Sequence, residues 1–369
     1  METQNLQNQH FQISEETSKR ITSLRFLLIV LVVFIHANLK ADDALNYYKL
    51  DFIQPKWIEI VKNFIYGTLG GAAVPLFFLF ASYIQFSKKD KYVCLLRKRS
   101  KSILLPYILW TVITIILYLI AQSIPQTALF FQNPNNIIKN WNILDYLKAF
   151  SYHDFSMGLK SPLVYQFWFL RELMIFIVLS PIFVLMCKKF GGGLLVLISV
   201  FAITGTPLYF TVSTSAFFFY LAGYYFATYE IDFFKIADKL KITEYIVLLI
   251  ISEIFSVCFG GKYSWGFVKI IISCLFFLKL SKYLVANEKL FLKLKYLSGY
   301  SFFLYAVHTP FLGTSINKIS WKIIPLHGIM CLVQFFVAAL LTIIIGTSIG
   351  IILNKICPPL FKLLNGGRK

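Results

Sequence analysis

Long apolar runs alternate with short polar segments along almost the whole chain. An apolar run of about 20 residues is long enough to cross the ~30 Å hydrocarbon core of a bilayer as a helix. Several runs reach or approach this length and predict an all-α integral membrane protein with about ten transmembrane helices. The predicted spans are 22–39, 64–86, 103–124, 164–186, 192–208, 213–229, 244–260, 264–284, 298–317 and 327–354.

Composition agrees with this pattern. The chain is 58% hydrophobic and 14% charged, whereas a soluble domain carries roughly 25% charged residues. The net charge of +19 would suit a nucleic-acid partner, but the charges lie in short segments between apolar runs and fit the positive-inside rule better. The six cysteines form no C-x-x-C pair. We therefore predict no nucleic-acid partner, no disulfide framework and no metal site.

The distribution of Lys and Arg predicts the orientation. With both termini in the cytoplasm, the inside segments hold more than twice as many basic residues as the outside segments, as the positive-inside rule requires. We predict one membrane domain over 20–354, between cytoplasmic tails at 1–19 and 355–369. No cleavage site follows the first apolar run, so we interpret it as a retained helix and not a signal peptide. In the outer segment 125–163, the stretch 141–150 has helical spacing and is predicted to lie flat on the membrane surface.

The first apolar run contains two ionisable residues, Arg25 and His36, which are eleven positions apart. On an α-helix they return to within about 20° of the same face and lie roughly 16 Å apart along the axis. Ionisable residues inside a membrane helix are costly and suggest a functional site. The alternative is an Arg that snorkels to one interface and a His at the other, and this pair alone does not separate the two interpretations.

The densest basic segment is 88–101, which contains Arg97, Arg99 and Lys101. Charge alone favours contact with anionic lipid head groups. The alternative is a binding site for a phosphate-bearing cytoplasmic ligand, with these three side chains as its contacts.

Two later spans also carry polar groups. Trp168, Arg171 and Glu172 lie in the span 164–186, where two adjacent ionisable residues favour a functional interpretation. Tyr305 and His308 lie three residues apart in the span 298–317 and share a helix face. His308 is suited to proton transfer, although a structural histidine fits equally well. Glu253 and Lys269 are predicted to form a structural ion pair.

Short motifs carry a resemblance to a known family. The chain resembles the type 3 membrane-bound acyltransferase family from about residue 18 to 354. In the first helix of the family, an Arg is followed by Ile-Asp-x-Leu-Arg, and Thr22 stands here in place of the Asp. In the second helix, a Phe-Phe is followed by a Ser-Gly, and Ala81 and Ser82 stand here in place of the Ser-Gly. The matching positions are Arg20, Ile21, Leu24, Arg25, His36, Phe77, Phe78, Arg99 to Tyr107 with its Leu-Pro-Tyr, Trp168 to Leu170, Tyr305, His308 and Pro310.

The resemblance implies an O-acyltransferase of the bacterial cytoplasmic membrane. Its co-substrate would be a cytoplasmic acyl-CoA, with acetyl-CoA as the expected donor, and its acceptor a hydroxyl of an extracytoplasmic or lipid-linked glycan. No bound cofactor is expected. The expected catalytic residues are His36 as general base or transient acyl carrier, His308, and Glu172, for which we infer a role in orienting His36. The expected donor- and substrate-binding residues are Arg25, Arg97, Arg99, Lys101, Trp168, Arg171 and Tyr305.

Two other functions remain open at this point. Ionisable residues at mid-membrane depth and a Pro-interrupted helix also fit a transporter or flippase for a glycan or small solute. The replaced Asp and Ser-Gly positions also fit a catalytically inactive scaffold of an envelope assembly machine. A transporter would move its substrate without consuming a donor, and a scaffold would tolerate the loss of His36.

Overall fold

The computed structural model describes residues 13–40, 44–45, 48–88, 90–128, 131, 134–155, 159–208, 213–259 and 265–368. The described residues are mainly helical, which confirms the predicted helical class. Their strands are β1 (His153–Phe155) and β2 (Leu159–Ser161), which pair antiparallel. The chain divides into two compact units: unit 1 is Met1–Ile35, Glu59–Leu95 and Phe176–Ser298, and unit 2 is His36–Ile58, Leu96–Ile175 and Gly299–Lys369.

Within the described residues, five helical segments are long and apolar enough to cross a membrane. They are Glu15–Ala37, Lys56–Ser87, Tyr92–Ser123, Tyr165–Phe190 and Met330–Ile356. The ten spans and the orientation of the termini stay predictions. The helix expected at 213–229 is present as the 15-residue α10 (Thr214–Thr228). The span expected at 298–317 differs in the structure, because it is interrupted near Pro310.

The first helix, α1 (Glu15–Ala37), begins earlier than the span expected at 22–39. The hydroxyl oxygen of Ser14 accepts a hydrogen bond from the backbone N–H of Thr17 at 3.1 Å, which is the N-cap arrangement. Glu15 and Glu16 lie in the first turn, where negative charges interact favourably with the helix dipole. A polar but well-capped turn therefore extends the helix into the segment expected to be a tail.

The other helices with residues in unit 1 follow in chain order. They are α2 (Lys56–Asn63), η3 (Phe64–Leu69), η4 (Gly70–Ala72), α3 (Ala73–Ser87), α4 (Tyr92–Arg99), α8 (Trp168–Phe190), α9 (Gly192–Thr204), α10 (Thr214–Thr228), α11 (Phe233–Asp238), α12 (Ile242–Phe259), α13 (Trp265–Ala286) and α14 (Glu288–Ser298). α2, α4 and α8 also contribute residues to unit 2.

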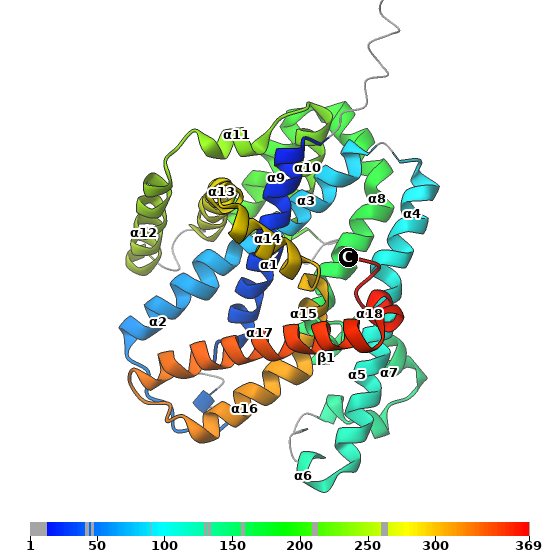
Figure 1. Cartoon of the computed structure of the whole chain (residues 1–369), viewed down its shortest axis with the longest axis vertical. Coiled ribbons are helices and arrows are strands. Elements are labelled where there is room, and N and C mark those ends of the chain that lie inside the picture. The colour runs from blue at the N-terminus through cyan, green and yellow to red at the C-terminus, as the bar shows by residue number, and fades with distance from the viewer. Residues whose placement is uncertain are drawn as a thin grey trace, which may run out of the picture. The chain divides into compact units, whose positions relative to one another are not determined.

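Close packing of α3 against α10 forms the centre of unit 1 (Figure 1). A Cβ atom at Gly223 of α10 would lie 2.5 Å from the carbonyl oxygen of Leu79 and 2.8 Å from Cβ of Ser82. Small residues at such positions let membrane helices approach closely. Any side chain at position 223 would therefore push the two helices apart.

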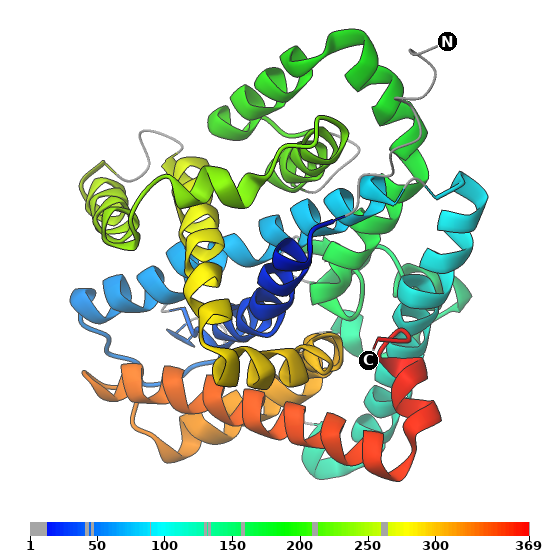
Figure 2. The same cartoon turned by 45° about the horizontal axis from the view of Figure 1, so that its top comes forward.

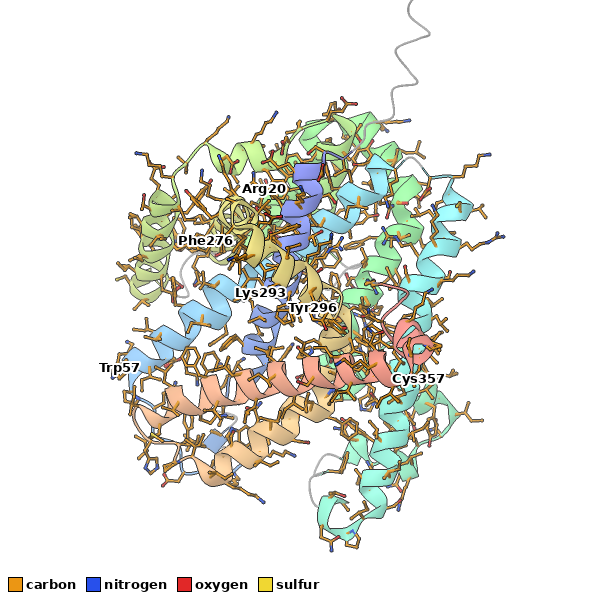
Figure 3. All side chains as sticks on the ribbon, viewed as in Figure 1. Arg20, Trp57, Phe276, Lys293, Tyr296 and Cys357 are labelled. Carbon is orange, nitrogen blue, oxygen red and sulfur yellow. The ribbon has the colours of Figure 1, made fainter. Side chains whose placement is uncertain are left out.

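Two buried polar clusters connect the helices of unit 1. Arg20 of α1 donates to both carboxylate oxygens of Asp238 at 2.8 and 3.0 Å, to Ser281 Oγ at 2.9 Å and to the carbonyl oxygen of Leu278 at 2.7 Å. Its guanidinium carbon lies 4.2 Å from the centroid of the Phe234 ring, and Figure 3 labels Arg20 on its helix. The charge of Arg20 is therefore neutralised and hydrogen-bonded within unit 1.

The second cluster surrounds Glu253 of α12. Its carboxylate accepts hydrogen bonds from Asn63 Nδ2 at 2.6 Å and from Thr68 Oγ1 at 2.5 Å. Lys269 Nζ of α13 lies 3.1 Å from Glu253 Oε2. The predicted ion pair between Glu253 and Lys269 is confirmed, and two further donors complete its hydrogen bonding.

The helices that lie wholly in unit 2 begin with η5, at the end of the basic segment 88–101. They are η5 (Ser100–Leu104), α5 (Leu105–Ser123), α6 (Pro125–Ala128), η6 (Pro134–Asn136), η7 (Ile138–Asn140), α7 (Ile143–Lys148), η8 (Tyr165–Phe167), α15 (Ser301–Val307), η9 (His308–Leu312), α16 (Gly313–Ile323), α17 (Met330–Ile356) and α18 (Pro358–Leu364). The start of α2 also belongs to unit 2, and its Trp57 is exposed (Figure 3).

The long helix α17 packs along α15 and α16 (Figure 2). Its buried residues include a row of small ones four apart, namely Ala338, Thr342, Gly346 and Gly350. A Cβ atom at Gly346 would lie 2.8 Å from Leu304 Cδ1. This row brings the backbone of α17 close to α15 and so supports the interrupted helix that follows α15.

The outer segment of unit 2 forms α7 between η7 and the β1–β2 ribbon. The side chain of Asn142 caps α7 and the side chain of Asp145 bonds back to the backbone of Asn142, as in a capping box. Ile143, Leu144 and Leu147 are exposed. The helix expected within 141–150 is therefore present, and its flat orientation on a membrane stays a prediction.

Candidate active site

The candidate site of unit 2 is built on a break in a helix. Thr309 has φ −140° and ψ 159°, an extended conformation between α15 and α16. Pro310 follows, and a proline has no N–H to donate to the carbonyl four residues earlier. The break therefore leaves the carbonyls of Tyr305, Ala306 and Thr309 in need of other donors.

Side chains supply those donors. Gln166 Nε2 donates to the carbonyl oxygens of Thr309 at 2.6 Å, Ala306 at 3.3 Å and Tyr305 at 3.5 Å. His308 Nδ1 lies 2.7 Å from the carbonyl oxygen of Tyr305. The hydroxyl of Tyr305 in turn donates to the carbonyl oxygen of Gln166 at 2.5 Å. Gln166 and α15 are thus joined in both directions.

These contacts determine which ring nitrogen carries the proton in neutral His308. Since a carbonyl oxygen only accepts, the Nδ1 atom that faces Tyr305 must carry the proton, and Nε2 keeps its lone pair. The side chain is fully buried, and Nε2 has no hydrogen-bond partner within the described residues. His308 therefore presents an open proton acceptor in a fixed orientation.

His36 lies beside His308. The centroids of the two imidazole rings are 5.2 Å apart, and the Tyr165 ring packs edge-on to His36 at 5.0 Å. Asn317 Nδ2 donates to the carbonyl oxygen of His36 at 3.4 Å, which satisfies one of the free carbonyls at the C-terminal end of α1. Gln334 Nε2 donates to Asn317 Oδ1 at 3.2 Å, so the amide of Asn317 is oriented toward His36. The structure thus brings the two predicted histidines together.

Arg171 and Glu172 form an ion pair, with 3.6 Å between Arg171 Nη2 and Glu172 Oε1. Arg171 Nη1 also donates to the carbonyl oxygen of Ser151 at 2.5 Å, and its guanidinium carbon lies 4.6 Å from the centroid of the Tyr152 ring. Arg171 therefore connects α8 with the outer segment. The predicted role of Glu172 in orienting His36 stays a prediction.

Trp168 begins α8 and is half-buried. Its neighbours Phe167 and Phe169 pack on the Tyr305 ring, with centroids 5.8 and 6.1 Å apart. Tyr305 itself is buried. The Trp-Phe-Leu and Tyr-x-x-His-x-Pro stretches thus meet at one place, around Tyr305.

Four further predicted binding cations come from α1, α4 and η5. Arg25 is in the unit 1 part of α1, and its side chain is exposed although Leu24 and Phe26 beside it are buried. Arg97 and Arg99 lie in the last turn of α4, and Lys101 lies in η5. Arg97 and Lys101 are exposed and Arg99 is half-buried. Their binding roles stay predictions.

Sequence reasoning missed four residues of the site: Tyr165, Gln166, Asn317 and Gln334. Gln166 and Gln334 are almost fully buried, and Asn317 is buried as well. Uncharged polar side chains within apolar spans are the signal that could have found them, since each must bond to something inside the membrane. Among the described residues, no group of three or more His, Cys, Asp or Glu side chains is placed to hold a metal ion.

Comparison with known proteins defines the class. A family model described as an acyltransferase domain matches residues 19–353, nearly the whole chain. The chain therefore belongs to the type 3 membrane-bound acyltransferase family, and five of its described helical segments are long and apolar enough to cross a membrane.

One curated relative is the succinoglycan biosynthesis protein ExoH of Rhizobium meliloti (strain 1021), which is 25% identical over 232 residues. The match covers 60% of this chain and 57% of the length of ExoH. No solved structure matches this chain significantly.

Proposed function

We propose that this protein transfers a short acyl group, with acetyl as the first candidate, from cytoplasmic acyl-CoA to a glycan hydroxyl outside the cytoplasm of a bacterium. The family supports acyl transfer, and the description of ExoH as a succinoglycan biosynthesis protein favours a polysaccharide or lipid-linked sugar as acceptor. The observation that carries the proposal is the pairing of His36 with His308 at 5.2 Å between ring centroids, together with the Nε2 atom of His308, to which no described residue is hydrogen-bonded.

Two histidines allow the reaction to be divided into two steps. In the first, an imidazole nitrogen of His36 attacks the thioester carbonyl, the N–acyl bond forms, the C–S bond breaks and CoA leaves as a thiolate. In the second, the acceptor hydroxyl oxygen attacks the acyl carbon and the N–acyl bond breaks. His308 Nε2 takes the hydroxyl proton as general base, and that proton finally passes through water to the CoA thiolate.

The cations have separate roles in this proposal. Arg25, Arg97, Arg99 and Lys101 bind the phosphates or the pantetheine arm of the donor, since guanidinium and ammonium groups pair well with phosphate. Tyr305 and Trp168 belong to the wall of the site. The predicted cytoplasmic termini would place the basic segment 88–101 on the donor side of the membrane.

The test separates the two steps. Purified protein in detergent is incubated with acetyl-CoA and radiolabelled free CoA, without acceptor, and the label that enters acetyl-CoA is measured. Exchange in the wild type that His36→Ala abolishes and His308→Gln keeps would support an acyl carrier at His36, as ping-pong chemistry requires. A wild type that neither exchanges nor consumes acetyl-CoA, with native membranes as the acceptor source, would contradict acyl-CoA as donor.

A further inference from the structure

We propose that Gln166 is a positioning residue whose side-chain amide keeps His308 in its productive protonation state. The inference rests on the proposed role of His308 as the base of the second step. Gln166 does not touch the reacting atoms in this proposal. It acts through the carbonyl groups that surround the imidazole of His308.

The contacts of Gln166 show an amide used for its donors alone. Nε2 of Gln166 donates to three carbonyl oxygens beside the break at Thr309 and Pro310: that of Thr309 at 2.6 Å, that of Ala306 at 3.3 Å and, at the longest distance, that of Tyr305 at 3.5 Å. The amide oxygen Oε1 is buried and has no partner within the described residues. An unpaired buried acceptor costs free energy. Its presence here is explained if the site needs the two donors of an amide close to η9.

Those donors control which acceptors remain for His308. Gln166 binds the carbonyls of Thr309 and Ala306 more closely than that of Tyr305, which it reaches only at 3.5 Å. The carbonyl of Tyr305 therefore keeps a lone pair that accepts the imidazole proton from Nδ1, at 2.7 Å. Without Gln166, the two freed carbonyls compete for that proton. An imidazole that turned toward them, or carried its proton on Nε2, could not accept a proton from the acceptor hydroxyl.

The backbone of Gln166 is held as well. The Tyr305 hydroxyl donates to its carbonyl oxygen, and this bond fixes the single turn η8 against α15. The amide therefore reaches η9 from a backbone that α15 itself positions. Orientation of a catalytic histidine by a neighbouring group is a recognised way to select its tautomer.

The chain provides a matched control at the other end of α15. Asn365 is fully buried, and its side-chain amide also bonds to backbone groups: it accepts from Phe303 N at 3.1 Å and donates to the carbonyls of Gly299 at 2.8 Å and Arg368 at 3.0 Å. Asn365→Leu removes as many backbone contacts as a Gln166 substitution, but far along the helix from His308. It reports what a merely structural loss does to both steps.

The experiment measures the two steps for the wild type, Gln166→Leu, Gln166→Glu and Asn365→Leu. Gln166→Glu keeps the shape of the side chain and replaces the donor NH₂ by an acceptor. For both Gln166 variants we expect kcat of transfer to fall by roughly 10- to 1,000-fold, within the share that a general base contributes. KM for acetyl-CoA and the CoA exchange rate should stay within about twofold, because they depend on His36 and the donor site.

The outcomes distinguish this inference from the proposed function. Exchange that is kept while transfer is lost, with Asn365→Leu lowering both in the same proportion, supports a positioning role. Equal loss of both steps in Gln166→Glu, or transfer at the wild-type rate in either Gln166 variant, overturns it. A wild type without exchange or transfer contradicts the proposed function, and this result would be seen before any variant is compared.

Discussion

The Arg20 cluster of unit 1 and the histidine pair of unit 2 both contain buried polar groups, but they differ in how completely those groups are hydrogen-bonded. Arg20 has Asp238, Ser281 and the carbonyl of Leu278 as hydrogen-bond partners. His308 uses one ring nitrogen and leaves the other, Nε2, without a partner in the described part of the chain. Both side chains are almost completely buried.

The difference separates structural from functional polar groups. Burying a polar group without a partner costs about 1–3 kcal/mol. Inside a membrane, water is rarely present to form the missing hydrogen bond. The satisfied Arg20 cluster stabilises the fold, as does the Glu253–Lys269 pair. An open nitrogen that its neighbours hold in place has no such structural use, and its geometry suits a proton acceptor.

The strongest test of this comparison is the loss of the open nitrogen. His308→Gln keeps a polar side chain of similar size but cannot act as a base near neutral pH. We expect acyl transfer to fall by about 10²- to 10⁴-fold, measured as the rate of acceptor acylation. The midpoint of thermal unfolding should stay close to that of the wild type. Transfer above a tenth of the wild-type rate would contradict the role of His308.

The Arg20 cluster should respond in the opposite way. Arg20→Met leaves Asp238 without its closest partner and should lower the free energy of unfolding by about 3–5 kcal/mol. The protein that remains folded should keep its transfer rate. Thermal unfolding in detergent, with activity normalised to folded protein, checks both statements.

Lys19→Met is the matched control for Arg20→Met. Lys19 pairs with Glu15 on the surface of the same helix at 2.7 Å, and 45% of its side chain is exposed. Such surface pairs contribute little, so stability should change by less than about 1 kcal/mol. Equal destabilisation by the two variants would show that the position on α1, and not the buried cluster, decides the effect.

A smaller effect is expected at Glu253. Glu253→Gln keeps one acceptor oxygen for Asn63 or Thr68, replaces the other oxygen by a donor NH₂ and removes the charge opposite Lys269. Hydrogen bonds to charged groups are worth about 1.5–3 kcal/mol, and we expect a loss in this range. The double variant Glu253→Gln/Lys269→Met should recover part of it, because the unpaired charge is then gone. Denaturant or thermal unfolding of Glu253→Gln, Lys269→Met, the double variant and the wild type forms the double-mutant cycle that tests this.

The sequence predicted the parts of the site that consist of rare residues in apolar runs. His36, Tyr305 and His308 were expected from such positions and from the motifs that carry the family resemblance, and the structure groups them. Glu253 and Lys269 were predicted as a pair because two opposite charges at similar depth favour each other's burial. Charge in an apolar run is therefore a dependable signal.

The positioning residues could not be found in that way. Gln166 contributes to the site only by donating to carbonyls that the break at Thr309 and Pro310 leaves free. No sequence pattern predicts the direction in which such carbonyls point. Asn317 contacts a residue 281 positions away in the chain. Single-sequence periodicity predicts which face of a helix is buried but not which distant side chain meets it. The early start of α1 had a local signal in Ser14, Glu15 and Glu16, which an apolar-run criterion does not use.

The smallest expected effect is the acid response of Asp238, the last residue of α11, which lies outside the predicted spans. Burial raises the pKa of Asp238. The hydrogen bond from Arg20 and the charges of Arg20, Lys282 and Lys279 together lower this pKa by more than burial raises it, so the pKa lies below the ordinary value. A carboxylate with a lowered folded pKa stabilises the fold above its unfolded pKa of about 3.9, and this stability is lost as pH falls through the folded value.

We therefore compare the wild type with Asp238→Asn across the acid range. The variant should be less stable at pH 7, and the difference should shrink as the pH falls below about 4, because protonation removes the advantage of the wild type. The side chain of Asp238 is 21% exposed, so we expect this pH-dependent part to be no more than about 1 kcal/mol. Unfolding midpoints in non-ionic detergent between neutral and acid pH measure it. Parallel curves for the two proteins would mean that Asp238 contributes to the Arg20 cluster through shape and hydrogen bonding and not through its charge.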